Sequence, residues 1–180
     1  MLKLQGERIY LAALEREDCK TLLENLEHDF GNPMETLDLG FSLENYDEWF
    51  EKVQKRLKGG THVNLGIFLN DDIIIGDVAL QRIDKTNRSC TLGMGFAKVE
   101  HRNQGYGTEA ASLMLKYGFY NLGLERIWAT TLEHNILAQK MMEKLGFRLE
   151  GIKRKAVYFC GKYIDEYHYG LLKEELIWQK

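Results

Sequence analysis

A short glycine-rich segment is the part of the sequence best suited to bind phosphate groups. His101–Thr108 has the sequence HRNQGYGT and lies between a predicted strand and a predicted helix. Gly105 and Gly107 let the backbone approach a ligand closely. The first N–H groups of the helix, at the positive end of its dipole, would face an anion. Because Arg102 and the hydroxyl of Thr108 add charge and hydrogen-bond donors, the segment predicts a phosphate-binding loop.

Two other motifs and a purely structural turn compete with this interpretation. A P-loop requires Gly-Lys-Ser/Thr, which is absent. A dinucleotide-binding fingerprint fits better, because Gly105, Gly107 and Ala110 satisfy G-x-G-x-x-A, and Glu125 follows at about the expected 20 residues. The polar loop 98–104 and the antiparallel hairpins predicted before it argue against that fold. A glycine turn without a ligand stays open as the third alternative.

Hydrophobic periodicity places this loop within a series of strands and helices. Apolar residues at helical spacing predict helices, and β-branched runs between polar turns predict strands. The predicted helices are 17–27, 43–57, 105–120 and 136–145, and the predicted strands are 8–14, 63–69, 73–83, 89–97, 126–132, 147–159 and 163–172. Residues 28–42 are irregular. The order is βαα, three antiparallel strands, αβα and a final hairpin, which predicts a mixed α/β fold rather than a doubly wound parallel sheet.

The composition is that of one globular domain. A chain of 180 residues with 44% hydrophobic residues and one proline predicts a single domain over 1–180. The net charge of −3 and the scattered basic residues argue against a nucleic-acid partner. No apolar stretch reaches membrane-spanning length, and the first residues lack the pattern of a signal peptide.

The three cysteines, Cys19, Cys90 and Cys160, are far apart in the sequence. None belongs to a CxxC pair or to a cysteine–histidine cluster, so neither a disulfide framework nor a zinc site is supported. We interpret them as buried, reduced thiols. Reduced thiols predict a cytoplasmic protein, and no metal is expected.

Three motifs in a fixed order carry a resemblance to a known family. Residues 91–96 (TLGMGF) followed by 102–107 (RNQGYG) are similar to the strand and the R-x-x-G-x-G/A coenzyme A motif of the GNAT N-acetyltransferases. Residues 133–135 (EHN) and 143–147 (EKLGF) match the E-N…E-K-L-G-F pattern of that family. The closing segment 150–172 resembles its ribosomal-protein N-terminal acetyltransferase branch.

The resemblance implies the GNAT acyl-CoA N-acyltransferase fold, a mixed central sheet with splayed central strands and flanking helices. The splayed strands would be 91–97 and 126–132, with pantetheine in the V-shaped slot between them and the pyrophosphate on the loop N–H groups. Asn135 would anchor the pantetheine arm or a bound water, and Lys144 would approach the nucleotide. The residues implied to bind coenzyme A are Phe96, Ala97, Lys98, Arg102, Asn103, Gln104, Gly105, Tyr106, Gly107, Thr108, Asn135 and Lys144.

The reaction implied is the attack of a neutral amine on the thioester carbonyl of acetyl-CoA. It needs an oxyanion donor and a route for proton transfer. The implied oxyanion donor is the backbone N–H near Phe96, which the splayed strand would leave unpaired. Asn135 and Asp165 are the other residues expected to take part in catalysis.

The proton-transfer groups that many family members use are missing. Met142 stands where many members have a tyrosine as general acid, and Thr91 stands where some have a carboxylate. Neither role can therefore be carried over from the resemblance. Hydroxyls and carboxylates of the closing hairpin and of the early loop supply further hypotheses, namely Tyr158, Tyr163, Glu35 and Asp38.

The sequence therefore predicts an acetyl-CoA-dependent N-acetyltransferase whose acceptor is a protein N-terminal amine. A polyamine or small-molecule amine is the alternative acceptor, and a non-catalytic acyl-CoA-binding module is the alternative function. The expected partners are acetyl-CoA and the amine acceptor, without nucleic acid, membrane or metal, and a homodimer is compatible with the sequence. The early residues that would select the acceptor contain no diagnostic motif.

Overall fold

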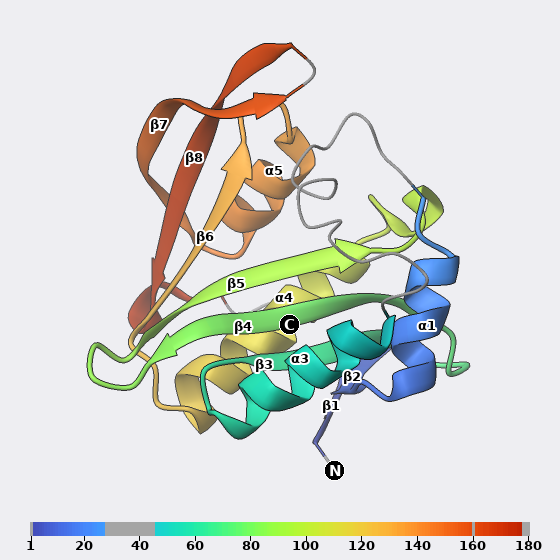
Figure 1. Ribbon diagram of the computed structural model, residues 1–180. Coiled ribbons are helices and arrows are strands. Elements are labelled where there is room, and N and C mark those ends of the chain that lie inside the picture. The colour runs from blue at the N-terminus through green and yellow to red at the C-terminus, as the bar shows by residue number, and fades with distance from the viewer. Residues whose placement is uncertain (1, 28–45, 160, 178–180) are drawn as a thin grey trace.

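A mixed β-sheet organises the molecule (Figure 1). The structure is a computed structural model and describes residues 2–27, 46–159 and 161–177. In these residues eight strands follow the order β1-β2-β3-β4-β5-β6-β8-β7 across the sheet. The strands are β1 (Lys3–Gln5), β2 (Ile9–Ala13), β3 (Val63–Leu69), β4 (Ile74–Asp84), β5 (Ser89–Phe96), β6 (Arg126–Leu132), β7 (Arg148–Phe159) and β8 (Lys162–Leu172). The helices are α1 (Arg16–Glu24), α3 (Tyr46–Lys58), α4 (Tyr106–Lys116) and α5 (Ile136–Lys144), with the short helical segments η2 (Val99–His101), η3 (Tyr117–Asn121) and η4 (Lys173–Glu175).

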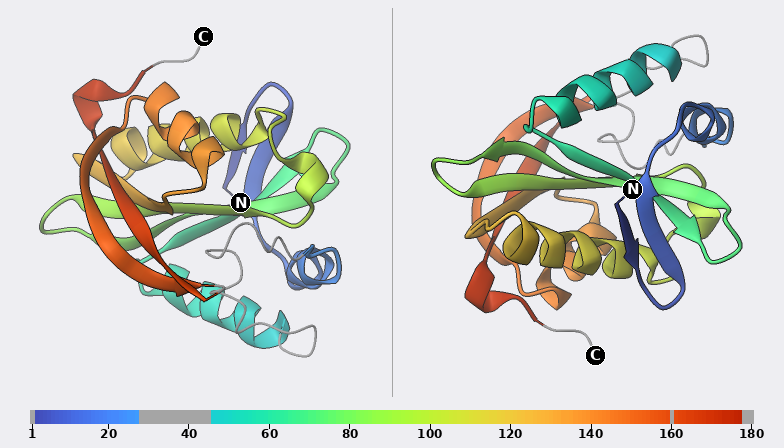
Figure 2. Two further views of the ribbon diagram at one scale, coloured as in Figure 1. Left: turned by 90° about the horizontal axis from the view of Figure 1, so that it is seen from above. Right: turned by 90° about the horizontal axis from the view of Figure 1, so that it is seen from below.

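Helices cover both faces of the sheet (Figure 2). α4 and α5 lie on one face, and α1 and α3 lie on the other. The larger core lies between the sheet and α4, and its fully buried members include Met114, Leu115, Phe119 and Ile127. A smaller core next to α1 consists of Leu14, Cys19, Leu22 and Ala97. Burial on both faces holds the central strands in place from two sides.

β5 and β6 are paired only at one end. Their parallel ladder has three residue pairs, and the last pair joins Thr91 to Trp128. Beyond this point β5 continues beside β4 as far as Phe96, whereas β6 continues beside β8 as far as Leu132. The two strands therefore diverge within the sheet (Figure 1). The splayed central strands expected from the sequence are confirmed.

The predicted elements are confirmed with small shifts at their ends. The helix predicted over 105–120 begins at Tyr106 and passes after Lys116 into the π-helical segment η3. Strand β1 has no signal in the sequence, because three residues with exposed ends are too short to show an alternating pattern. Residues 28–42, the start of the helix predicted over 43–57, and Cys160 lie outside the described residues.

The described thiols are packed in the protein interior. Cys19 and Cys90 are both free and buried, and burial raises the pKa of each to about 12, so both are protonated at neutral pH. The described part of the chain contains no group of three or more histidine, cysteine, aspartate or glutamate side chains that could hold a metal ion. Within the described ranges, no helix has both the length and the apolar character needed to cross a membrane.

Candidate active site

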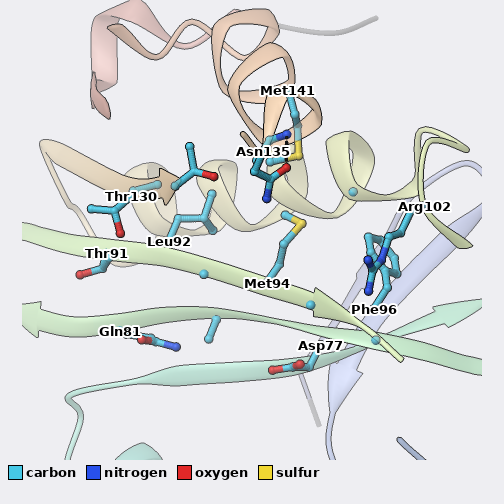
Figure 3. Close-up of a pocket in the computed structure, with 18 of the residues that line it drawn as sticks. Asp77, Gln81, Thr91, Leu92, Met94, Phe96, Arg102, Thr130, Asn135 and Met141 are labelled. Carbon is cyan, nitrogen blue, oxygen red and sulfur yellow. Dashed lines mark hydrogen bonds between the residues drawn. The ribbon is translucent and has the colours of Figure 1, made fainter. Parts of the chain in front are cut away.

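A cavity of about 1330 Å³ follows the gap between β5 and β6 and is lined from both faces of the sheet (Figure 3). Leu92, Met94 and Phe96 line it on the α4 side, where they pack against the larger core. Thr91 and Gly95 alternate with them along β5 and line the cavity on the α1–α3 side. The gap between the strands therefore joins the surface beside α4 and α5 to the surface beside α1 and α3.

The glycine loop lies at the α4 side of this cavity. Gly105 is the N-cap of α4 and has a left-handed backbone with φ +86°, a conformation that suits glycine. No side chain in the described residues caps the first turn, which leaves its N–H groups to an anion. A Cβ at Gly107 would lie 3.4 Å from both the Met94 sulfur and the Phe96 ring. The absence of a side chain at Gly107 thus lets the first turn of α4 lie close to β5, and phosphate binding by the loop stays a prediction.

The residues just before β2 brace this loop. Arg8 Nη1 donates to the carbonyl oxygen of Gln104 (2.8 Å), and the guanidinium lies over the Tyr106 ring, 5.0 Å from its centroid. The Glu109 carboxylate accepts from the backbone N–H groups of Glu7 (2.7 Å) and Arg8 (3.0 Å). Sequence reasoning misses Arg8, because no local pattern signals a contact with a residue 96 positions away.

Asn135 lies at the α5 side of the cavity. It is the N-cap of α5, and its Oδ1 accepts from the N–H of Ala138 (3.1 Å). It also lines the cavity, and Figure 3 shows it on the same side of the sheet as Met94. The helix-cap interpretation is confirmed. That Asn135 anchors the pantetheine arm or a bound water stays a prediction, which its place in the cavity lining allows.

The backbone N–H of Phe96 points into the gap. The next residue, Ala97, donates its N–H to the carbonyl oxygen of Ile75 in β4 (3.0 Å). Because N–H directions alternate along an antiparallel strand, the N–H of Phe96 points away from β4 and toward the space that β6 vacates. This is the position expected of an oxyanion donor.

Among the described residues that line the α1–α3 side of the cavity, cations outnumber carboxylates. Lys52 and Arg56 of α3 line it together with Arg82 of β4. Asp77 is the only carboxylate among the described lining residues. Burial lowers the pKa of His62, and the charges of Arg56 and Arg82 lower it further, so this lining imidazole is neutral at pH 7.

Two buried side-chain oxygens on the same side have no hydrogen-bond partner among the described residues. They are Asn64 Oδ1 and Thr91 Oγ1. Asn64 of β3 pairs with Ala79 of β4, which pairs with Gly93 of β5, and Thr91 pairs with Gln81 of β4, whose side chain also lines the cavity. A buried acceptor without a partner costs about 1–3 kcal/mol. A ligand that donates hydrogen bonds would recover this cost.

The amino-acid sequence matches a known protein family. The family described as "Acetyltransferase (GNAT) domain" matches residues 8–148. The chain belongs to the GNAT acetyltransferases. Its curated relatives include "Probable N-acetyltransferase YjcK" of Bacillus subtilis (strain 168), which is 31% identical over 167 residues that cover 90% of this chain and 92% of that protein.

Solved structures share the fold of this GNAT acetyltransferase. The spermidine N-acetyltransferase from Vibrio cholerae, in complex with CoA and spermine, superposes with a TM-score of 0.82 at 22% identity, covering 94% of this chain and 98% of that one. The ribosomal-protein-S5-alanine acetyltransferase from Vibrio fischeri superposes with a TM-score of 0.80 at 18% identity, covering 98% and 100%. At these identities the likeness establishes the GNAT fold.

Family membership decides between the interpretations of the glycine loop. The chain is an acetyl-CoA-dependent N-acetyltransferase. The dinucleotide interpretation fails because antiparallel β3, β4 and β5 precede the loop, instead of the βαβ unit that a dinucleotide fold requires. The non-catalytic module is likewise not the function that the family indicates.

Most residues predicted to bind coenzyme A line the cavity of this GNAT acetyltransferase. They are Phe96, Ala97, Arg102, Asn103, Gly105, Gly107, Thr108, Asn135 and Lys144. Lys98, Gln104 and Tyr106 are not among the lining residues. The Lys98 Nζ lies 3.8 Å from the Glu100 carboxylate, and the other two contact Arg8. For these three, a contribution to coenzyme A binding stays a prediction.

Asp165 is not brought to the cavity. Its carboxylate accepts from the backbone N–H of Lys155 (2.7 Å), which has φ +52° at an irregularity in the β7–β8 pairing. It is not among the lining residues. The structure therefore gives Asp165 a role in shaping the hairpin, and the catalytic role expected from the sequence has no support in the lining of the cavity.

The remaining residues considered for proton transfer lie in three parts of the chain. Tyr158 and Tyr163 form an exposed pair in the β7–β8 hairpin, 62% and 63% accessible, with ring centroids 5.0 Å apart. Met142 lines the cavity and is buried within the larger core. Glu35 and Asp38 lie outside the described residues.

Proposed function

We propose that this GNAT acetyltransferase transfers the acetyl group of acetyl-CoA to the N-terminal amine of a protein or peptide. Coenzyme A binds beside α4 and α5, with its pyrophosphate at the N–H groups of the glycine loop. The amine enters beside α1 and α3 and meets the thioester in the gap, where the N–H of Phe96 faces the developing oxyanion. The observation that carries the proposal is the cavity that joins both sides of the sheet where β5 and β6 diverge after the pair of Thr91 and Trp128, a point called the strand fork below.

The charges on the acceptor side favour a peptide over a polyamine. Proteins of this fold include a spermidine N-acetyltransferase and a ribosomal-protein-S5-alanine acetyltransferase, so the fold does not choose between the two. In the described lining of this side, three cations (Lys52, Arg56 and Arg82) face one carboxylate (Asp77). A polyamine carries several positive charges and would be repelled. A peptide with one terminal amine avoids this repulsion, and acidic side chains after its first residue would be attracted.

Hydrogen bonding supports the same acceptor. Asn64 Oδ1 and Thr91 Oγ1 are buried and open to donors. A peptide supplies an amine and a series of backbone N–H groups, whereas the methylene chains of a polyamine supply few donors at that spacing. A peptide N-terminus therefore satisfies both oxygens more fully.

A panel of acceptors tests the proposal. Release of free coenzyme A and the mass of each acceptor are measured with peptides that have free N-termini, the same peptides with blocked N-termini and an internal lysine, spermidine, and a small primary amine. We expect kcat/KM for the free peptides to exceed that for spermidine at least tenfold, and the blocked peptides to stay unmodified. Spermidine as the preferred acceptor would contradict the proposal.

A charge reversal isolates the acceptor side from general effects. Arg56→Glu should lower kcat/KM for peptides with acidic second and third residues and raise it for spermidine. Lys55→Glu is the matched control, because Lys55 is also on α3 but does not line the cavity. Equal shifts in both variants would show that overall charge, rather than the cavity, sets the preference.

A further inference from the structure

Asp77 occupies a position from which a carboxylate can reach the strand fork. It belongs to β4 and pairs with Gly95 of β5, beyond the last residue pair between β5 and β6. Figure 3 shows Asp77 on the same side of the sheet as Gln81 and Thr91, opposite Met94. The carboxylate therefore lies on the side from which the amine is proposed to enter.

The glycine at position 95 leaves this path open. A Cβ built at Gly95 would lie 3.9 Å from Asp77 Oδ1, so the carboxylate stands directly beside the space that a side chain would fill. Both residues line the cavity. Because Gly95 has no side chain, nothing from β5 itself stands between the Asp77 carboxylate and the gap.

The chemistry requires a group of this kind. An α-amino group has a pKa of about 7.7–8.0 and arrives largely as an ammonium at neutral pH. It must lose a proton before or during attack on the thioester. The hydroxyl of Thr91, at the sequence position where some family members have a carboxylate, is far too weak a base for this. Asp77 is the only carboxylate in the described lining.

We propose that Asp77 binds the acceptor ammonium and takes its proton. The step rests on the proposed function. The ammonium donates a hydrogen bond to the Asp77 carboxylate and transfers one proton to it, which leaves a neutral amine. The amine nitrogen forms a bond to the thioester carbonyl carbon, the carbon–sulfur bond breaks, and the thiolate leaves with a proton from solvent. As the tetrahedral intermediate collapses, its nitrogen loses the remaining extra proton to water. Asp77 then releases the proton it took to solvent, so atoms and charges balance and the carboxylate is regenerated.

Asp77 acts among several charged and titratable neighbours. Those that share its side of the cavity or interact with it electrostatically are Lys52 and Arg56 on α3, His62 before β3, Arg82 on β4 and Cys19 on α1. Burial and then the negative charge of Asp77 raise the pKa of Cys19 to about 12. The thiol is therefore protonated throughout the working range.

The test compares Asp77→Asn and Asp77→Glu with wild type, and uses Asp71→Asn as control because Asp71 is an exposed carboxylate outside the cavity. The readouts are kcat/KM for a peptide acceptor from pH 6 to pH 10, the affinity for acetyl-CoA, and the melting temperature. We expect Asp77→Asn to lose about 10²-fold or more in kcat/KM at pH 7. Acetyl-CoA affinity should be unchanged, and Asp77→Glu should recover part of the rate.

The shape of the pH profile separates proton transfer from a structural role. Wild type uses the ammonium, so its kcat/KM should be nearly flat below the pKa of the amine. Asp77→Asn needs amine that is already neutral, so its kcat/KM should rise about tenfold per pH unit and the defect should shrink as the pH increases. Parallel pH profiles of wild type and Asp77→Asn would overturn the inference while leaving the proposed function intact. A loss of acetyl-CoA affinity in Asp77→Asn as large as its loss of kcat/KM would do the same. If wild type acetylates no amine at all, both the proposed function and this inference are wrong.

Discussion

Thr91 of β5 and Trp128 of β6 are the last residues that these two strands pair. Beyond them β6 keeps only its other neighbour, β8, with which it pairs along its whole length to Leu132 and Glu166. The fork is therefore a property of the strand pairing and does not depend on a mobile loop. It explains why one cavity can be reached from both faces of a sheet that helices cover on each side.

Negative charge at Gly105 should weaken acetyl-CoA binding. Gly105→Asp places a carboxylate where the pyrophosphate approaches the first N–H groups of α4, so the dissociation constant measured by calorimetry should rise at least tenfold, about 1.4 kcal/mol. Gly105→Asn is the matched control, since it has the same shape and tolerates a left-handed backbone. In both variants the new Cβ meets Arg8 Nη2 at 2.8 Å, so that steric cost is shared. Equal weakening in the two variants would mean that charge at the loop is irrelevant.

Loss of the Arg8 brace should affect acetyl-CoA binding and spare the chemical step. In Arg8→Ala the side-chain contacts to the Gln104 carbonyl and to the Glu109 carboxylate disappear, while the backbone N–H still donates to Glu109, so the loop is held less firmly. We expect KM for acetyl-CoA to rise several-fold with kcat within twofold of wild type. Arg8→Lys keeps the charge, so its KM for acetyl-CoA should lie between those of wild type and Arg8→Ala. A fall in kcat without a change in KM would show that Arg8 does not act through the loop.

A tyrosine at position 142 tests whether this residue faces the thioester. Met142 is 2% accessible and belongs to the larger core, so Met142→Tyr should be overpacked and lose about 1–3 kcal/mol of stability. Because Met142 also lines the cavity, the new hydroxyl should reach the leaving thiolate and raise the single-turnover rate of acetyl transfer. Met142→Phe has the same bulk without the hydroxyl. Identical rates in the two variants would place position 142 in the core only.

The sequence predicts the coenzyme A side of the site much better than the acceptor side. The motif from Thr91 to Thr108 is contiguous, and its glycines and helix start act locally, so their geometry follows from their order. Asn64 and Asp77 join the site only through strand register, and register depends on pairing across the whole sheet. Asp165 shows why proximity to a motif is a weak guide to function, since its carboxylate accepts a hydrogen bond from the backbone of its own hairpin and does not line the cavity.

The buried thiols predict how stability depends on pH. The pKa values of Cys19 and Cys90 are raised from 9.0 to about 12, so the unfolded chain ionises these thiols first. The contribution of the two protonated thiols to stability is complete below pH 9. The free energy of unfolding should therefore fall as the pH rises from 9 toward 12. Urea denaturation at pH 8 and pH 10 measures this fall. The double variant Cys19→Ala, Cys90→Ala should show a smaller fall, and an equal fall would assign the effect to other groups.

A crystal structure with bound coenzyme A tests the central claim most directly. The account predicts the pyrophosphate within hydrogen-bond distance of backbone N–H groups between Asn103 and Thr108, and the sulfur in the gap beyond the pair of Thr91 and Trp128. The sulfur should be reachable from the α1–α3 side, where the amine enters. Coenzyme A bound away from the fork, or a sulfur enclosed on the α4 side, would contradict the account.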